Sequence, residues 1–153
     1  MSIPYLYDNE TKQRTPATRV KANIWAAGIV YGTIDDQAKW MMTNLNRGVY
    51  KEERILSKKT FDKVMTQHFR DDEMNFREFW GNDTSGMGLT WWLSEIDGDQ
   101  HFAHSGSVPG YTAWATGNLT EGVGVVLLTN GHRSHPHLAK LASTALSLMK
   151  ANE

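Results

Sequence analysis

The eight residues from His104 to Tyr111 combine a titratable side chain with a glycine-containing turn, which together could serve a ligand-binding site. They read His-Ser-Gly-Ser-Val-Pro-Gly-Tyr, a run of small residues that ends in a Pro-Gly turn. Histidine can accept or donate a proton near neutral pH. Glycine lets the backbone approach a ligand, and N–H groups beside it can stabilise a developing oxyanion. The pattern therefore predicts a strand whose end lines a ligand-binding site.

The residues around this motif carry the turn signals and alternation of antiparallel strands. One strand is predicted over 88–93, and Asp97-Gly98 is a turn signal before the strand that contains His104. A hairpin is predicted from 111–116 and 123–129. Its second arm is apolar on both faces, which favours a central position in the sheet.

Helices are predicted before and after this strand region. Thr33 and Ser57 can each cap a helix by accepting hydrogen bonds from free N–H groups of the first turn, and a third helix follows Pro136. The predicted organisation is an extended lead-in (1–23), a helical part (24–86), antiparallel strands (87–130) and a C-terminal helix (134–151). This is an α+β fold, with an antiparallel sheet of three to four strands flanked by helices.

Two segments resemble the class C β-lactamase-like serine hydrolases, a group that includes esterases and D-alanyl peptidases. Segment 26–36, Ala-Ala-Gly-Ile-Val-Tyr-Gly-Thr-Ile-Asp-Asp, is similar to their glycine-rich block before a helix. Segment 104–111 resembles their third active-site motif, which is Lys-Thr-Gly or His-x-Gly. The resemblance covers nearly the whole chain and implies the C-terminal half of the β-lactamase/transpeptidase-like fold.

The resemblance implies an acyl-enzyme mechanism on an ester, peptide or β-lactam substrate, with no cofactor and no metal. His104 would face the substrate and assist proton transfer, while Ser105 would line the strand. The backbone N–H of Ser107, just after Gly106, would form half of the oxyanion hole. The candidate residues are therefore His104, Ser105, Gly106 and Ser107 for catalysis, and Gly110 and Tyr111 for substrate binding.

The other two motifs of these hydrolases are not found where the resemblance requires them. A Ser-x-x-Lys motif supplies the acylated serine and a Tyr-x-Asn or Ser-x-Asn motif assists it, both normally far before the glycine-rich block. Residues 147–150 spell Ser-x-x-Lys, but in the last turn of the final helix, where the helix dipole would oppose an alkoxide. Tyr7-Asp8-Asn9 spells Tyr-x-Asn too close to that block. We expect a chain that is inactive alone and pairs with a missing N-terminal half.

A histidine cluster allows a different interpretation of the chemistry. His132, His135 and His137 could bind a metal ion only if they converged, usually with a carboxylate beside them. Pro136 separates two of them at the start of a predicted helix. A solvated helix start is therefore the favoured interpretation.

The tryptophans are interpreted as structural. Trp91 and Trp92 are neighbours on a predicted strand and should point to opposite faces, one into the core and the other beneath the loop over 70–86. Trp25 and Trp40 are expected in the core.

The composition excludes several classes of partner. The net charge is −1, and the 16 basic and 17 acidic residues are interspersed, so nucleic acid and anionic membranes lack a basic surface to bind. The longest mostly apolar run, 123–129, is too short to span a membrane. The chain has no cysteine, which excludes a disulfide scaffold and a thiol nucleophile. Nothing in the sequence indicates a compartment.

Three functions remain as hypotheses. The first is the C-terminal portion of a serine hydrolase that supplies the His-x-Gly strand to a site for a small-molecule or peptide substrate. The second is a non-catalytic remnant that serves as an interaction module. The third, and least favoured, is a self-contained metal-dependent hydrolase. A partial domain would also leave apolar surface bare, which predicts self-association.

Overall fold

The fold is built around one antiparallel sheet, and the computed structural model describes residues 2–18, 28, 30–70 and 84–150. The strand order is β10-β9-β8-β7-β6-β5. The strands are β5 (Phe69–Arg70), β6 (Thr84–Met87), β7 (Trp92–Ile96), β8 (Asp99–Val108), β9 (Tyr111–Asn118) and β10 (Val123–Thr129). The α+β antiparallel architecture is confirmed, with six strands in the sheet where three to four are expected from the sequence.

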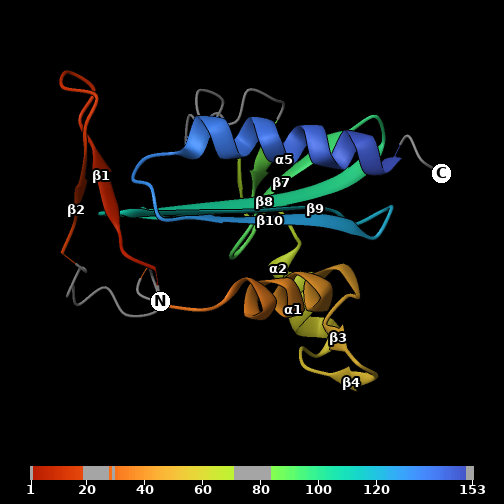
Figure 1. The fold of residues 1–153 in the computed structure, drawn as a ribbon. Helices are drawn as coiled ribbons and strands as arrows, with labels where there is room; N and C mark the ends of the chain where they lie inside the picture. The colour runs from red at the N-terminus through yellow and green to blue at the C-terminus, as the bar shows by residue number, and fades with distance from the viewer. Residues whose placement is uncertain (1, 19–27, 29, 71–83, 151–153) are drawn as a thin grey trace.

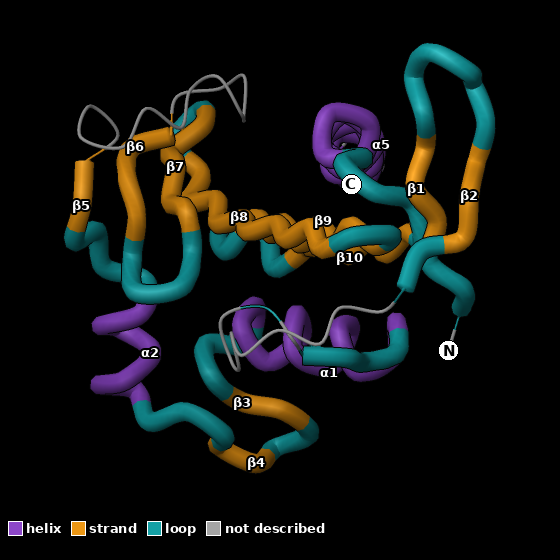
Figure 2. Tube along the Cα trace, turned by 90° about the vertical axis from the view of Figure 1, so that its left-hand side faces the viewer, coloured by secondary structure: helices purple, strands orange, loops and turns teal. Residues whose placement is uncertain are grey.

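Helices cover both faces of the sheet. Helix α5 (His135–Lys150) lies on one face and α1 (Ile34–Leu45) on the other, as Figures 1 and 2 show from two directions. Helix α2 (Lys58–Val64) lies on the same side as α1, after the short hairpin of β3 (Val49–Tyr50) and β4 (Glu53–Arg54). The lead-in contains a hairpin that the sequence analysis does not predict, formed by β1 (Tyr5–Tyr7) and β2 (Arg14–Pro16).

The two faces of the sheet bury separate apolar clusters. On the side of α1 and α2 the cluster consists of Met41, Phe61, Trp91, Phe102 and Leu119. On the side of α5 it consists of Trp114, Leu138 and Ala142. The middle of the sheet is therefore fixed from both sides.

The predicted helix starts are confirmed by their capping bonds. The Thr33 hydroxyl accepts a hydrogen bond from the Asp36 N–H at 3.2 Å, and the Asp36 carboxylate accepts one from the Thr33 N–H at 3.0 Å. This reciprocal pair is a capping box. The Ser57 hydroxyl accepts from the Thr60 N–H at 3.1 Å and caps α2. The predicted C-terminal helix is present as α5.

Among the described strands β10 lies at an edge of the sheet, in contrast to the central position that its sequence predicts. It pairs with β9 on one side, and no other strand of the described chain pairs with it. Its two apolar faces are explained by the helices, because α1 and α5 both pack against it. A strand covered by helices on both faces has the same sequence pattern as a central strand.

The strand predicted over 88–93 is displaced. The structure places a turn at residues 88–91, closed by a hydrogen bond from the Gly88 N–H to the Trp91 carbonyl, and β7 starts at Trp92. Trp91 is buried in the core as expected for one of the pair. The loop expected over Trp92 falls mainly on 71–83, outside the described residues.

The expectation that Trp40 belongs to the core is wrong. Its side chain is 42% exposed, because α1 buries the face that carries Met41 and Asn44 instead. Trp25 lies outside the described residues.

Candidate functional site

The motif at 104–111 occupies the end of β8, the start of β9 and the turn between them. Val108 pairs with Tyr111, which leaves Pro109 and Gly110 as a two-residue turn. Gly110 has φ +87, a conformation that favours glycine. The predicted strand and Pro-Gly turn are therefore both present.

The register of this hairpin determines the direction of the Ser107 backbone. In an antiparallel ladder, hydrogen-bonded and non-hydrogen-bonded pairs alternate, and a two-residue turn is closed by a hydrogen-bonded pair. Val108 is therefore bonded to β9. The Leu119 N–H donates to the Gln100 carbonyl at 2.7 Å, which places the even-numbered residues of β8 in the bonded set. Ser107 is odd-numbered, so its N–H points away from β9.

The opposite edge of β8 is only partly covered. Strand β7 pairs with β8 from Ile96 opposite Asp99 to Trp92 opposite Ala103, and no described strand continues beyond that point. The Ser107 N–H points to this uncovered edge. Among the described strands, none pairs with β8 at this edge beside the motif.

His104 is held between two tryptophan rings. Its imidazole stacks on the Trp92 indole with 4.2 Å between ring centroids and 4° between planes. The Trp91 ring meets it edge-on, with 6.4 Å between centroids. Burial lowers the pKa of His104 below its usual 6.5, and a hydrogen bond with the Ser105 backbone acts weakly in the opposite direction. The ring is therefore neutral at neutral pH.

The Ser107 side chain is engaged in the fold. Its hydroxyl donates to the Tyr111 carbonyl at 3.1 Å and accepts from the Arg133 N–H at 3.3 Å. It also lies 3.3 Å from the Thr112 hydroxyl and 3.4 Å from His132 Nδ1. These contacts fix β8 against the loop before α5. The hydroxyl is occupied, whereas the backbone N–H faces the open edge.

The two glycines and the tyrosine of the motif differ in their surroundings. A Cβ added to Gly106 would meet nothing within 4 Å, so this position leaves open space above the strand. A Cβ on Gly110 would lie 2.2 Å from the Pro4 Cβ. The Tyr111 hydroxyl donates to the Ser2 carbonyl. Gly110 and Tyr111 thus hold the N-terminal segment, and their expected contact with substrate stays a prediction.

The N-terminal segment is attached by further backbone bonds to the residues that follow β10. The Tyr5 N–H donates to the Asn130 carbonyl at 3.0 Å, and the His132 N–H donates to the Tyr5 carbonyl at 3.2 Å. Residue 5 therefore bridges in parallel to Gly131, directly after β10.

His132 is engaged in hydrogen bonding, and the three histidines do not form a metal site within the described ranges. His132 Nδ1 lies 3.1 Å from the Val108 carbonyl. Burial, followed by the charge of His132, lowers the pKa of His135. No group of three or more His, Asp or Glu residues suited to a metal ion occurs in the part of the chain that the structure describes.

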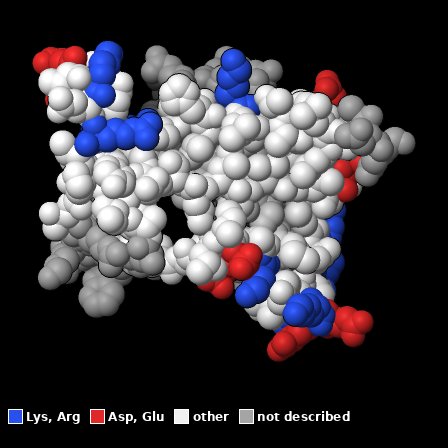
Figure 3. Space-filling view, viewed as in Figure 1, with Lys and Arg blue, Asp and Glu red and all other residues white. Residues whose placement is uncertain are grey.

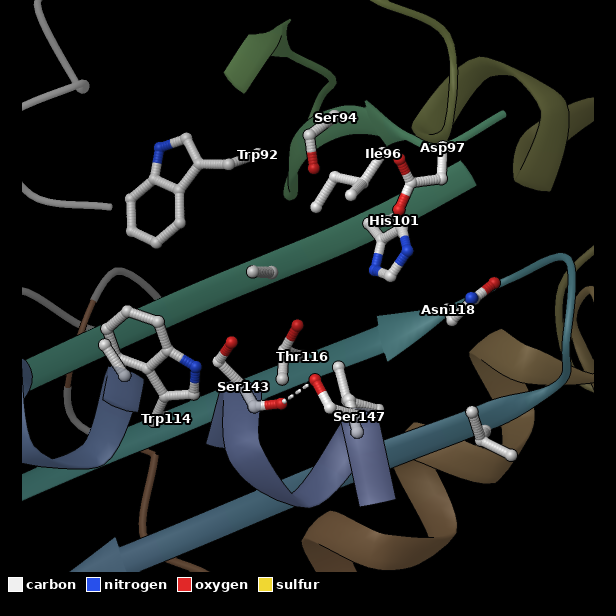
Figure 4. A pocket seen from close by; sticks show the side chains of 14 residues that line it. Trp92, Ser94, Ile96, Asp97, His101, Trp114, Thr116, Asn118, Ser143 and Ser147 are labelled. Carbon is white, nitrogen blue, oxygen red and sulfur yellow. Dashed lines mark hydrogen bonds between the residues drawn. The ribbon is translucent and has the colours of Figure 1, made fainter. Parts of the chain in front are cut away.

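Ser147, which begins the Ser-x-x-Lys look-alike, lies on α5. Its hydroxyl donates to the Ser143 carbonyl at 3.0 Å. Both serines face a cavity of about 240 Å³ between α5 and the sheet, which Figure 4 shows together with Trp92, His101 and Trp114. None of residues 104–111 lines this cavity. Ser147 and the His-x-Gly motif are therefore separate features.

The aromatic contacts of His104 are the part of the site that the sequence analysis misses. The Asp97-Gly98 turn sets the register that puts Trp92 opposite Ala103. Residues opposite one another share a face and successive residues alternate, so the turn predicts Trp91, and not Trp92, on the face of His104. The edge-on contact with Trp91 therefore has a sequence signal, whereas the stacking on Trp92 has none.

Figure 3 shows one face of the molecule, on which basic and acidic side chains intermingle toward the margins. Among the helices of the described residues, none is long and apolar enough to cross a membrane.

Comparisons with known proteins agree on a single relationship. A family model described as Beta-lactamase matches residues 3–149. Among solved structures, the chain is similar to the octameric penicillin-binding protein homologue from Pyrococcus abyssi, with 25% sequence identity and a TM-score of 0.77. That match covers 98% of this chain and 31% of the other, so this chain spans about a third of that relative's length. No curated protein gives a significant match.

Proposed function

This chain belongs to the β-lactamase family, and we propose that it supplies the His-x-Gly wall of an acyl-transfer site. The observation that carries the proposal is the direction of the Ser107 N–H, which points to the edge of β8 that β7 leaves uncovered. A fixed N–H on an open edge can stabilise the oxyanion of a tetrahedral intermediate. Gly106 leaves space for the substrate beside it.

His104 assists proton transfer in this proposal. A neutral imidazole can accept a proton from an attacking hydroxyl and return it to a leaving group. Stacking on Trp92 holds the ring in one orientation. Ser105 lines the strand between His104 and Gly106.

The attacking hydroxyl comes from a polypeptide segment other than residues 104–111 and 147–150. The Ser107 hydroxyl is engaged by Tyr111 and Arg133. The Ser147 hydroxyl is on α5, donates to Ser143, and faces a cavity that residues 104–111 do not line. We therefore expect no acyl transfer from the chain by itself.

The reaction class is acyl transfer to a serine hydroxyl with an ester, peptide or β-lactam as acyl donor. The serine oxygen adds to the carbonyl carbon, and the resulting oxyanion accepts a hydrogen bond from the Ser107 N–H. The C–O bond of an ester, or the C–N bond of a peptide or β-lactam, then breaks as the leaving oxygen or nitrogen takes up the serine proton through His104; the nitrogen of a β-lactam stays attached to the acyl group. Water then releases the acyl group. Each step uses the same uncovered edge of β8.

Binding of an acyl compound at the Ser107 N–H can be tested separately from the identity of the nucleophile. ¹⁵N-labelled chain is titrated with acetanilide, a neutral acyl compound, and the Ser107 amide resonance is followed by NMR. We expect a saturable shift that is lost in Gly106→Ala, because the new methyl group fills the open space. Gly98→Ala, which also adds a methyl group in open space, should retain the shift.

The nucleophile is tested on the same protein. A fluorophosphonate probe should label no serine, and p-nitrophenyl butyrate should not be hydrolysed above background. Labelling at Ser147 would contradict the assignment made here. Absence of any shift at Ser107 would contradict the proposed wall.

A further inference from the structure

We infer that the site on β8 selects uncharged acyl compounds with an apolar body, because an aromatic-stacked imidazole and an apolar row of strand residues face it. The inference rests on the proposed function and names the substrate class of the same site.

His104 contributes no fixed charge to the site. The position that the family's motif fills with either lysine or histidine is here an imidazole stacked on Trp92 and met edge-on by Trp91. A charge placed between two indoles loses much of its hydration, so the ring favours its neutral form. No charged side chain in the described part of the chain contributes to the pKa of His104. The motif therefore offers a carboxylate no fixed cation.

The surface beside the motif is apolar. Gly106 pairs with Ala113, and Ala113 pairs with Leu128 on β10. Residues directly opposite one another in adjacent strands share a face, so these three form one row. His104 lies on the same face, two residues before Gly106. The row has no polar side chain, and Leu128 is 42% exposed. An apolar acyl or leaving group can rest on it.

Arg133 is the cation that could oppose this selectivity. Its backbone N–H donates to the Ser107 hydroxyl. The Ser107 side chain lies on the α5 face, opposite to His104, because successive side chains of a strand alternate. Arg133 thus approaches the motif from the other face. It is therefore included in the test.

The experiment compares two probes that differ by one carboxylate. The 153-residue chain, labelled with ¹⁵N and ¹³C, is titrated with acetanilide and with 4-acetamidobenzoate, and the resonances of His104, Gly106 and Ser107 are followed by NMR. We expect the neutral probe to bind more tightly to the wild-type chain. His104→Lys adds a cation and should shift the ratio of the two dissociation constants toward the carboxylate by about fivefold, the effect of a partly exposed ion pair.

Two further variants control for charge and folding. His137→Lys adds the same charge on an exposed position of α5 and should leave the ratio unchanged. His104→Gln keeps a neutral polar side chain and should preserve the preference for acetanilide, which keeps the inference testable if His104→Lys does not fold. Arg133→Ala should also preserve it.

The outcomes separate the inference from the proposed function. Tighter binding of 4-acetamidobenzoate to the wild-type chain, or a ratio that His104→Lys leaves unchanged, would overturn the selectivity while leaving the wall in place. If 4-acetamidobenzoate binds and its binding is lost in Arg133→Ala, Arg133 recognises the carboxylate, and the proposed selectivity is overturned as well. If neither probe shifts residues 104–107, the proposed function fails together with the inference.

Discussion

The imidazole of His104 lies parallel to the indole of Trp92, with 4.2 Å between ring centroids. Burial in this contact is the main cause of the low pKa of His104. Trp92→Ala should therefore raise that pKa toward 6.5, because water reaches the ring and stabilises its charged form. Trp92→Phe keeps an aromatic cover and should leave the pKa low. An NMR titration of the His104 ring measures both, and an equal pKa in the two variants would refute the assigned cause.

The stability of the chain should fall as the pH drops below 6.5. The pKa values of His104 and His135 are lowered in the folded chain, so the unfolded chain takes up protons first. Stability rises with pH wherever the unfolded state binds more protons. The contribution of the two histidines to stability is therefore fully present above pH 6.5. It is lost as the pH falls through their pKa values in the folded chain. Urea unfolding between pH 7.5 and 5 tests this, and the double variant His104→Gln with His135→Gln should have a flatter profile.

The capping box at Thr33 should contribute measurably to stability. Thr33→Ala removes the acceptor for the Asp36 N–H and should lower the free energy of unfolding by about 1 kcal/mol. Thr33→Ser keeps the hydroxyl and should change it little. Urea unfolding of both variants would disprove the role of the cap if their midpoints coincide.

Two glycines with nearly the same φ should respond differently to alanine. Gly98 has φ +86 with nothing near its Cβ position, so Gly98→Ala should cost only the strained φ, about 1–2 kcal/mol. Gly110 has φ +87 and a Cβ would overlap Pro4, so Gly110→Ala should cost roughly 1–3 kcal/mol more. It should also speed proteolysis of the N-terminal segment. Equal losses would show that the contact with Pro4 contributes nothing.

The chain should self-associate as its concentration rises. Both helices that cover the sheet expose large apolar side chains, Ile34, Trp40 and Met42 on α1 and Leu141, Leu148 and Met149 on α5. Leu141→Lys should weaken association because it replaces an exposed apolar side chain. Thr144→Lys, three residues further along α5, adds the same charge without removing an apolar group and should weaken association less. Light scattering across a dilution series measures the mass. A monodisperse wild-type monomer at all concentrations would count against the prediction.

The parts of the fold that sequence analysis predicts are those with local signals. Thr33 and Ser57 cap helices through bonds within three residues, and Asp97-Gly98 closes a two-residue turn. The motif at 104–111 is predicted for the same reason, since a strand and a Pro-Gly turn specify it. In each case the residues that decide the structure are neighbours in the chain.

The parts that it misses depend on distant contacts. An apolar strand at 123–129 is compatible with a central position or with two covering helices, and only the packing of α1 and α5 decides between them. The exposure of Trp40 depends on which face of α1 meets the sheet. The Ser107 hydroxyl is occupied by residues of the loop before α5, more than twenty positions away. Local patterns carry no information about such pairs.

The attachment of residue 5 to residues 130–132 has a consequence for the order of folding. The β8–β9 hairpin closes over a turn of two residues, so its ladder can form early and at little entropic cost. The attachment of Tyr5 joins positions more than a hundred residues apart and must wait until β10 and the start of α5 are in place. We expect amide exchange at Tyr5 to be faster than at His104 or Ala115. Local opening would begin where Tyr5 attaches to residues 130–132 and would reach β8 last.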